Sequence, residues 1–241
     1  MSGGPSDPKA IEVMNADAQL RAAADEFVLR GCRHRYPYNF TWLGVPVIQF
    51  PQDMIALQEV VFRSRPDVIV ETGVAHGGGT IFLASMLELL GGDGRVVAID
   101  VDIRPHNREV IESHRMAGRI ALVEGSSTDA AVVQRVHALA RGKRALVVLD
   151  SDHTHDHVLA ELRAYERLVM EGGYLVVLDT IVDRMSPAEI GERPWGKGNS
   201  PMSAVREFLR ENKRFDIDRE LEDTLLITVA PEGYLRCIED P

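Results

Sequence analysis

Two acidic residues at the ends of neighbouring apolar runs could hold a metal ion. Asp150 ends the run 144–150, and Asp179 ends the run 173–179. The carboxyl ends of parallel strands meet at one edge of a sheet, so we expect both carboxylates at the same rim. Paired carboxylates suit a hard divalent cation such as Mg²⁺, which could hold a substrate diol. The alternative for Asp150 is a helix-capping or cofactor-site carboxylate.

A histidine follows the first of these carboxylates closely. His153 lies three residues after Asp150, so we expect it beside the metal. An imidazole titrates near neutral pH and is a natural general base for a hydroxyl proton. His155 and His157 alternate with His153 at the beginning of a helix, so the three cannot all face one zinc ion. A surface or packing role is the alternative for His153.

A glycine-rich turn follows the first strong apolar run, 67–73. Glu71, Gly73 and Gly77 have the spacing E-x-G-x-x-x-G, and a helical stretch comes next. Glycines let the backbone approach a ligand closely. A dinucleotide fingerprint would need glycine where the chain has Ala75, whereas the observed spacing is the usual first motif of S-adenosylmethionine (SAM) methyltransferases. His76 is a weaker candidate for contacting the same cofactor, and a tight turn without a ligand is the alternative.

The next two runs also end in polar residues. Asp100 ends the run 95–100, where an acid can bind both ribose hydroxyls of either a NAD or a SAM cofactor. Ser126 and Ser127 follow the run 119–125 and offer small groups where an adenine would lie. Helix capping is the alternative for these positions.

Short β-branched runs alternating with helical stretches must position these side chains. The runs are 67–73, 95–100, 119–125, 144–150 and 173–179, and the helical stretches are 78–90, 105–117, 128–141 and 155–170. This alternation predicts a buried parallel sheet. A helix over 201–212 and two final strands near 214–222 and 224–230 complete the pattern. We therefore predict an α/β, Rossmann-like class I methyltransferase fold: a seven-stranded, mostly parallel sheet with an antiparallel last strand and helices on both faces.

The residues before position 66 lack this alternation and are predicted to form a separate segment. We predict an N-terminal helical and aromatic lid segment over 1–65 and a methyltransferase domain over 66–241. Residues 1–10 are expected to fray, and helices are expected over 16–30 and 53–64. The aromatic, proline-broken stretch 33–53 is expected to be a lid or substrate-binding segment, with a strap over the core as the alternative.

Aromatic and amide side chains offer an acceptor site. Tyr38 and Trp42 lie in the aromatic stretch, and Trp195 and Asn199 lie in the Gly/Pro-rich loop 183–200. Such groups can stack on a sugar and bond to its hydroxyls. A merely mobile, exposed loop is the alternative for 183–200.

Composition narrows the function classes. The 241 residues carry a net charge of −10, so nucleic-acid binding is not expected. No apolar run approaches the length of a membrane span, and the N-terminus lacks the apolar region of a signal peptide. We expect a cytoplasmic protein without a disulfide framework, since it has only 2 cysteines.

Taken together, these motifs resemble those of the cephalosporin hydroxylase / rhamnosyl O-methyltransferase family. The resemblance covers roughly residues 36–230 and rests on YNFTWLG, VETGVAHGGG, VVAIDVD, EGSSTD, LDSDHTH and EGGYLVVLDT. It implies a class I fold, SAM as methyl donor and, in several members, a divalent metal. It further implies O-methylation of a hydroxyl on a sugar or other secondary-metabolite or glycan acceptor, and a homo-oligomer, dimer or larger.

The resemblance also assigns individual residues. It places the SAM loop at Glu71 and Gly73, the ribose acid at Asp100, the strand-end metal ligand at Asp150, the histidine after it at His153, and the second acid of a pair at Asp179. At the position of the first acid of that pair, this chain has Leu178 instead. A site with two carboxylates would bind Mg²⁺ more weakly, or recruit Asp152, Thr180 or water.

We therefore expect a SAM-dependent O-methyltransferase, metal-assisted, with His153 as base. Two alternatives stay open. One is a non-catalytic SAM- or sugar-binding partner subunit, which Leu178 keeps in view. The other is an NAD-dependent oxidoreductase on the same sheet, against which Ala75 argues.

Overall fold

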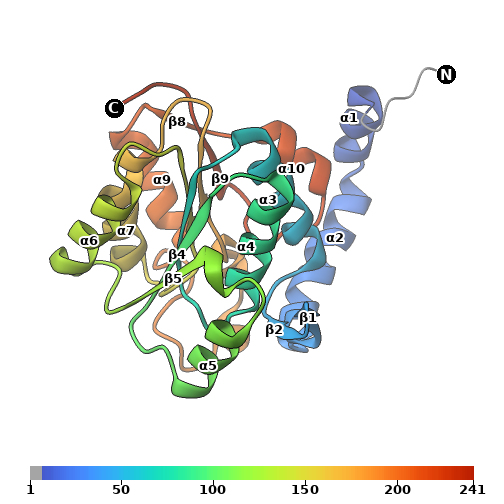
Figure 1. Ribbon diagram of the computed structural model, residues 1–241. Coiled ribbons are helices and arrows are strands. Elements are labelled where there is room, and N and C mark those ends of the chain that lie inside the picture. Colours follow the sequence, from blue (N-terminus) through green and yellow to red (C-terminus); the bar gives the residue numbers. More distant parts are fainter. Residues whose placement is uncertain (1–6) are drawn as a thin grey trace.

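The computed structural model describes residues 7–241, and its centre is a seven-stranded sheet (Figure 1). The order across the sheet is β5-β4-β3-β6-β7-β9-β8. Six strands run in one direction, and β9 runs antiparallel to both of its neighbours, β7 and β8. The strands are β3 (Val68–Thr72), β4 (Arg95–Asp100), β5 (Ile120–Glu124), β6 (Ala145–Leu149), β7 (Tyr174–Val177), β8 (Phe215–Ile217) and β9 (Tyr234–Cys237). The predicted class I methyltransferase architecture is confirmed.

Helices cover both faces of this sheet because its central strands are apolar on both sides. The larger helices are α3 (Pro51–Ser64), α4 (Gly78–Leu90), α5 (Pro105–Ser113), α6 (Ala130–Ala140), α7 (His155–Tyr165) and α9 (Pro201–Glu211). One core layer joins the sheet to α3 and α4, and the other joins it to α6, α7 and α9. Figure 1 shows these groups on opposite sides of the strands. Within residues 7–241, no helix has both the length and the apolar character needed to cross a bilayer.

The C-terminal part differs from the sequence prediction. The two final strands are shorter than expected, and the second is β9 at Tyr234–Cys237 rather than 224–230. Between them lies α10 (Arg219–Leu225). Asp218, the residue before it, caps the helix by accepting the Leu221 N–H with its carboxylate. The strand predicted at 224–230 is wrong because its residues bond elsewhere: the Val229 N–H donates to the buried carboxylate of Asp53.

The N-terminal segment is ordered over most of its length. It contains α1 (Pro8–Ala16), α2 (Ala18–Arg33) and the hairpin of β1 (Phe40–Trp42) with β2 (Val45–Val47). The prediction of fraying is wrong for residues 8–10, because Asp7 caps α1 and Pro8 begins it. The rest of that prediction, residues 1–6, lies outside the described residues.

Asp53 joins this segment to the far end of the chain. Its carboxylate is fully buried in α3 and accepts hydrogen bonds from the Thr228 hydroxyl, the Val229 N–H and the Tyr234 hydroxyl. A buried carboxylate is costly unless donors surround it. These three donors compensate Asp53 and hold α3 against the turn before β9.

Candidate active site

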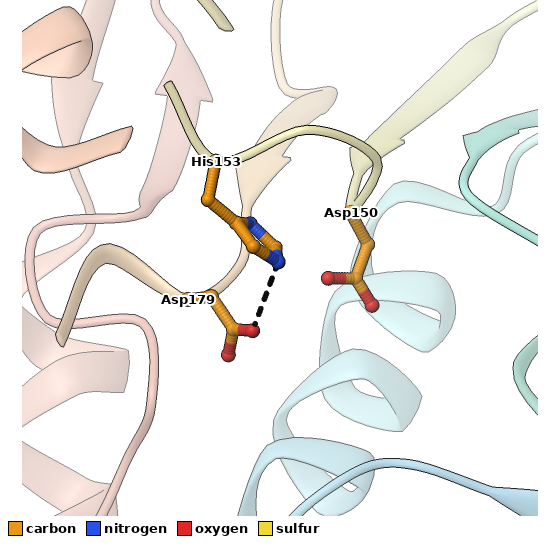
Figure 2. A group of neighbouring side chains, drawn as sticks. All are labelled: Asp150, His153 and Asp179. Atoms are coloured by element: carbon orange, nitrogen blue, oxygen red, sulfur yellow. Dashed lines mark ion pairs between the residues drawn. The ribbon is translucent and has the colours of Figure 1, made fainter. Parts of the chain in front are cut away.

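Three side chains converge where β6 and β7 end. Asp150 directly follows β6, Asp179 precedes the short helix η4 (Thr180–Arg184), and His153 lies in the loop before α7. Figure 2 shows the three side chains pointing toward one another. One possible ligand atom from each lies within 4.8 Å of the others, and His153 Nε2 is 3.4 Å from Asp179 Oδ2. Two carboxylates and an imidazole in this arrangement fit a divalent cation.

Gln49 is a fourth member of this group that the sequence did not single out. Its Nε2 donates to Asp150 Oδ2 over 3.0 Å, and its side chain is buried. Within residues 7–241, its Oε1 is buried without a hydrogen-bond partner. In the sequence, Gln49 stands out only as the polar side chain within the apolar stretch VPVIQFP.

The electrostatics of Asp150 also favour a cation. Burial raises the pKa of the Asp150 carboxyl well above its ordinary value, and the nearby carboxylates of Asp179 and Glu71 raise it further. A positive charge beside Asp150 and Asp179 would offset both effects. Leu178, where the resemblance would place a third acid, is buried in the apolar core instead.

The glycine turn lies directly against this group. Gly73 has φ +89°, and a Cβ there would lie 2.0 Å from the carbonyl oxygen of Asp150. Asp100, at the end of β4, accepts the N–H groups of Val74 and Ala75 at 2.8 and 3.3 Å. The loop expected to bind SAM is therefore fixed between the ends of β4 and β6.

Glu71 supports the same loop from the protein interior through a hydrogen bond with α4. It is buried at the end of β3 and accepts the hydroxyl of Thr80 in the first turn of α4. Burial raises the pKa of Glu71 to about 8. His76, Gly77 and the turn around them precede α4, and His76 lines a small cavity of about 50 Å³ together with Glu71 and Gly73.

A larger cavity of about 450 Å³ opens beside the glycine turn. Residues from four strand ends line it: Gly73, Ala75, Asp100, Ser126, Ser127, Asp150 and Ser151. The structure thus brings together most of the residues predicted to contact SAM, and the cavity has the size range of a cofactor site.

A buried polar network forms the floor of this cavity. Ser127 and Ser151 both donate to Glu161 Oε1, and His157 Nε2 lies 3.4 Å from the same oxygen. The hydrogen bond to Glu161 raises the pKa of His157. The sequence analysis did not single out Glu161. A carboxylate among the apolar residues on the buried face of α7 was the signal that could have indicated a buried polar group.

A second cavity, of about 510 Å³, also borders the acidic group. His153, Asp179, Tyr38 and Trp195 are among its lining residues, and Trp195 lies edge-on to His153 with ring centres 5.0 Å apart. Trp195 also lines the first cavity, so the two cavities meet at this ring. A small molecule in this second cavity could therefore reach His153 and Asp179.

Two residues predicted to bind the acceptor lie elsewhere. Trp42 packs edge-on against Phe82 and donates Nε1 to Ser85 on α4. Asn199 Oδ1 accepts the His155 N–H and its Nδ2 donates to the Pro194 carbonyl, which holds the loop 183–200 against α7. Neither residue is among those that line the cavities of about 450 and 510 Å³.

Comparisons with known proteins agree with this geometry. Curated relatives include the rhamnosyl O-methyltransferase of Mycobacterium leprae (strain TN), 30% identical over 217 residues that cover 84% of this chain and 87% of the relative. The rhamnosyl O-methyltransferase of Mycobacterium tuberculosis (strain H37Rv) is 28% identical over 225 residues, covering 89% of this chain and 84% of the relative.

Solved structures show the same fold. A CmcI structure with Mg and SAM has a TM-score of 0.57 at 20% identity, covering 83% of this chain and 77% of that one. An O-methyltransferase from Bacillus cereus in complex with S-adenosylhomocysteine (SAH) has a TM-score of 0.52 at 16% identity, covering 86% and 88%. The family model described as Rhamnosyl O-methyltransferase/CmcI matches residues 34–238. The predicted resemblance is thereby confirmed, and the chain belongs to the Rhamnosyl O-methyltransferase/CmcI family.

Proposed function

We propose that this protein transfers a methyl group from SAM to a hydroxyl of a sugar or other glycan-like acceptor. The observation that carries the proposal is the position of the acidic group between two cavities, one beside the glycine turn and one beside Tyr38 and Trp195. The names of the relatives support O-methylation of a sugar as the reaction class.

The cavity beside the glycine turn would take SAM. Asp100, which lines this cavity, would accept hydrogen bonds from the ribose hydroxyls beside those it accepts from the N–H groups of Val74 and Ala75. Ser126 and Ser127 lie where an adenine would extend. Glu71, Gly73, His76 and Gly77 would shape the turn that faces the methionine part.

His153 would act as the base at the acceptor hydroxyl. It lines the acceptor cavity, and Asp179 and Trp195 restrain its ring. In the transfer, the carbon–sulfur bond of the sulfonium breaks, a carbon–oxygen bond forms, and the hydroxyl proton passes to an imidazole nitrogen. Because the sulfonium methyl is already activated, alignment of donor and acceptor supplies much of the rate.

The donor set of Asp150 and Asp179 would hold Mg²⁺, which supplies electrostatic stabilisation of negative charge developing on the acceptor oxygen. The residues present fit a hard cation, and the buried, unpartnered Oε1 of Gln49, whose Nε2 donates to Asp150, would supply a further neutral ligand. Tyr38 and Trp195 would bind the acceptor, while Trp42 and Asn199 hold the surrounding backbone.

The described part of the predicted lid segment, residues 7–65, would then close the acceptor side of the site, since Tyr38 and Gln49 line that cavity. A homo-oligomer stays a prediction that follows from the family.

Calorimetric titration of the purified chain with SAM and SAH tests the proposal. Submicromolar to micromolar binding, together with methyl transfer to an aryl rhamnoside, is the expected result. Binding without turnover on any glycoside would favour the partner-subunit alternative. A positive titration with NADH and none with SAM would favour the oxidoreductase.

A further inference from the structure

Two arginines face the acceptor cavity. Arg35 precedes the short helix η1 (Tyr36–Asn39), and Arg193 lies in the loop 183–200. Both line the cavity of about 510 Å³ that His153 and Asp179 also line. The cavity wall therefore carries two positive charges, although the whole chain has a net charge of −10.

Each guanidinium is supported by an aromatic ring of the same cavity. The Arg35 guanidinium carbon lies 4.3 Å from the centre of the Tyr38 ring, and that of Arg193 lies 5.7 Å from the Trp195 ring. Stacking restrains a guanidinium while leaving its N–H edge free to donate. These arginines are thus held in place by the rings expected to contact the acceptor.

Neither guanidinium has a carboxylate partner in the described part of the chain. Two nearby arginines are paired: Arg33 with Glu189 at 2.8 Å and Arg184 with Asp25 at 3.3 Å. Across residues 7–241, no ion pair involves Arg35 or Arg193. The donors of both side chains stay available to a ligand that enters the cavity.

We infer that the acceptor carries an anionic group, a carboxylate or a phosphate, in addition to the hydroxyl that is methylated. Arginine binds both anions through two parallel hydrogen bonds, which are stronger than hydrogen bonds between neutral groups. The acceptor class is then an acidic glycan, such as a uronic acid residue, or a glycosyl phosphate. This inference rests on the proposed function, because it specifies the occupant of the acceptor cavity.

Matched ligand pairs test this inference by calorimetry, with and without SAH. One pair is 4-nitrophenyl β-D-glucuronide and 4-nitrophenyl β-D-glucoside, which differ only in the carboxylate. The other is α-D-glucose 1-phosphate and methyl α-D-glucoside. We expect the charged member of at least one pair to bind about tenfold or more tightly than its neutral partner. The pair with the larger ratio identifies the anion.

Variants then connect the preference to the two arginines. In Arg35→Met/Arg193→Met the affinity ratio between charged and neutral ligand should fall toward one. Arg35→Lys/Arg193→Lys, which keeps the charge but loses the paired donors, should retain only part of it. Arg141→Met is the matched control. Arg141 follows α6 and precedes the beginning of β6, whereas the site lies where β6 ends. Its ratio should equal that of the wild type.

Equal affinity for both members of each pair in the wild type overturns the inference, as does a ratio that the double methionine variant leaves unchanged. SAM titration of the same samples separates this outcome from failure of the proposed function. If SAM binds and a neutral glycoside is methylated without any preference for charge, only the anionic acceptor is wrong. If SAM does not bind, the proposed function fails, while the ligand pairs still report the chemistry of the cavity.

Discussion

The Nε2 atom of His153 lies 3.4 Å from Oδ2 of Asp179, and both side chains line the acceptor cavity. This contact gives the imidazole a fixed orientation toward the place where the acceptor hydroxyl is expected. It also places the imidazole within reach of a cation held by the carboxylates. The two roles predict different consequences when His153 is replaced.

Replacing His153 with alanine should lower kcat by about 10²- to 10⁴-fold if the imidazole removes the hydroxyl proton. SAM affinity should stay near the wild-type value, because His153 does not line the cavity beside the glycine turn. Steady-state kinetics and SAM calorimetry on the same preparation measure both. A large loss of Mg²⁺ affinity in His153→Ala would identify the imidazole as a metal ligand instead.

Replacing Asp179 with asparagine should weaken Mg²⁺ binding by more than about tenfold, because a neutral amide replaces one of the two carboxylates. Chelation of the wild-type enzyme with EDTA should lower turnover in the same direction, and added Mg²⁺ should restore it. Asp156→Asn is a suitable control, since Asp156 belongs to the first turn of α7 and not to the cluster. Wild-type turnover that persists after chelation would contradict a metal requirement.

Gln49→Glu tests whether this side chain compensates for Leu178. The substitution keeps the shape of the side chain and adds a carboxylate beside Asp150, where Gln49 now donates a hydrogen bond. Repulsion between two carboxylates should lower Tm without metal, and Mg²⁺ should raise Tm more than in the wild type. Thermal unfolding with and without Mg²⁺ measures this difference. A smaller Mg²⁺-induced shift than in the wild type would exclude Gln49 from the metal site.

The sheet could be predicted from the sequence because its signal is local. Segments such as Ala145–Leu149 are continuously apolar, and the parallel strands they form end where the polar residues begin. The positions of Asp100, Asp150 and Asp179 followed from this rule alone. The segment 224–230 is also rich in apolar and β-branched residues, yet its backbone donor at Val229 bonds to Asp53, 176 positions away. No local sequence pattern could reveal that contact. The hydrogen bond from Gln49 to Asp150, 101 positions away, is equally invisible to a local pattern.

Replacing Asp100 with alanine should weaken SAH binding by about 10- to 100-fold, because hydrogen bonds to a charged acceptor contribute about 1.5–3 kcal/mol. The substitution also frees the N–H groups of Val74 and Ala75. Asp102→Ala is the matched control, since the Asp102 backbone N–H donates to Asp100 while its own side chain is exposed. Unchanged SAH affinity in Asp100→Ala would remove Asp100 from the cofactor site.

The free energy of unfolding should depend on pH through Glu71. Burial raises its pKa from 4.5 to about 8, so the folded state keeps a proton that the unfolded chain has released. Stability from this group is therefore greatest below pH 4.5 and falls as the pH rises toward 8. Relative to Glu71→Gln, the wild type should lose up to about 1.4 kcal/mol per pH unit in this window.

Urea unfolding of both proteins at several pH values between 5 and 8 measures this difference. Glu109→Gln, at an exposed position on α5, controls for the loss of one carboxylate from the chain. A gap between the wild type and Glu71→Gln that stays constant with pH would show that the folded and unfolded states hold the same proton.

The buried bonds of Asp53 impose an order on folding during synthesis. Its donors lie 175 to 181 residues later in the chain, at Thr228, Val229 and Tyr234. When the ribosome has made the N-terminal segment, the carboxylate has no partner and water must solvate it. Docking of α3 against the turn before β9 therefore waits until nearly the whole chain has emerged, and closing so long a loop is slow. The segment that carries Gln49 and Tyr38 is made early, but α3 beside it completes its buried hydrogen bonds only when Thr228, Val229 and Tyr234 are in place.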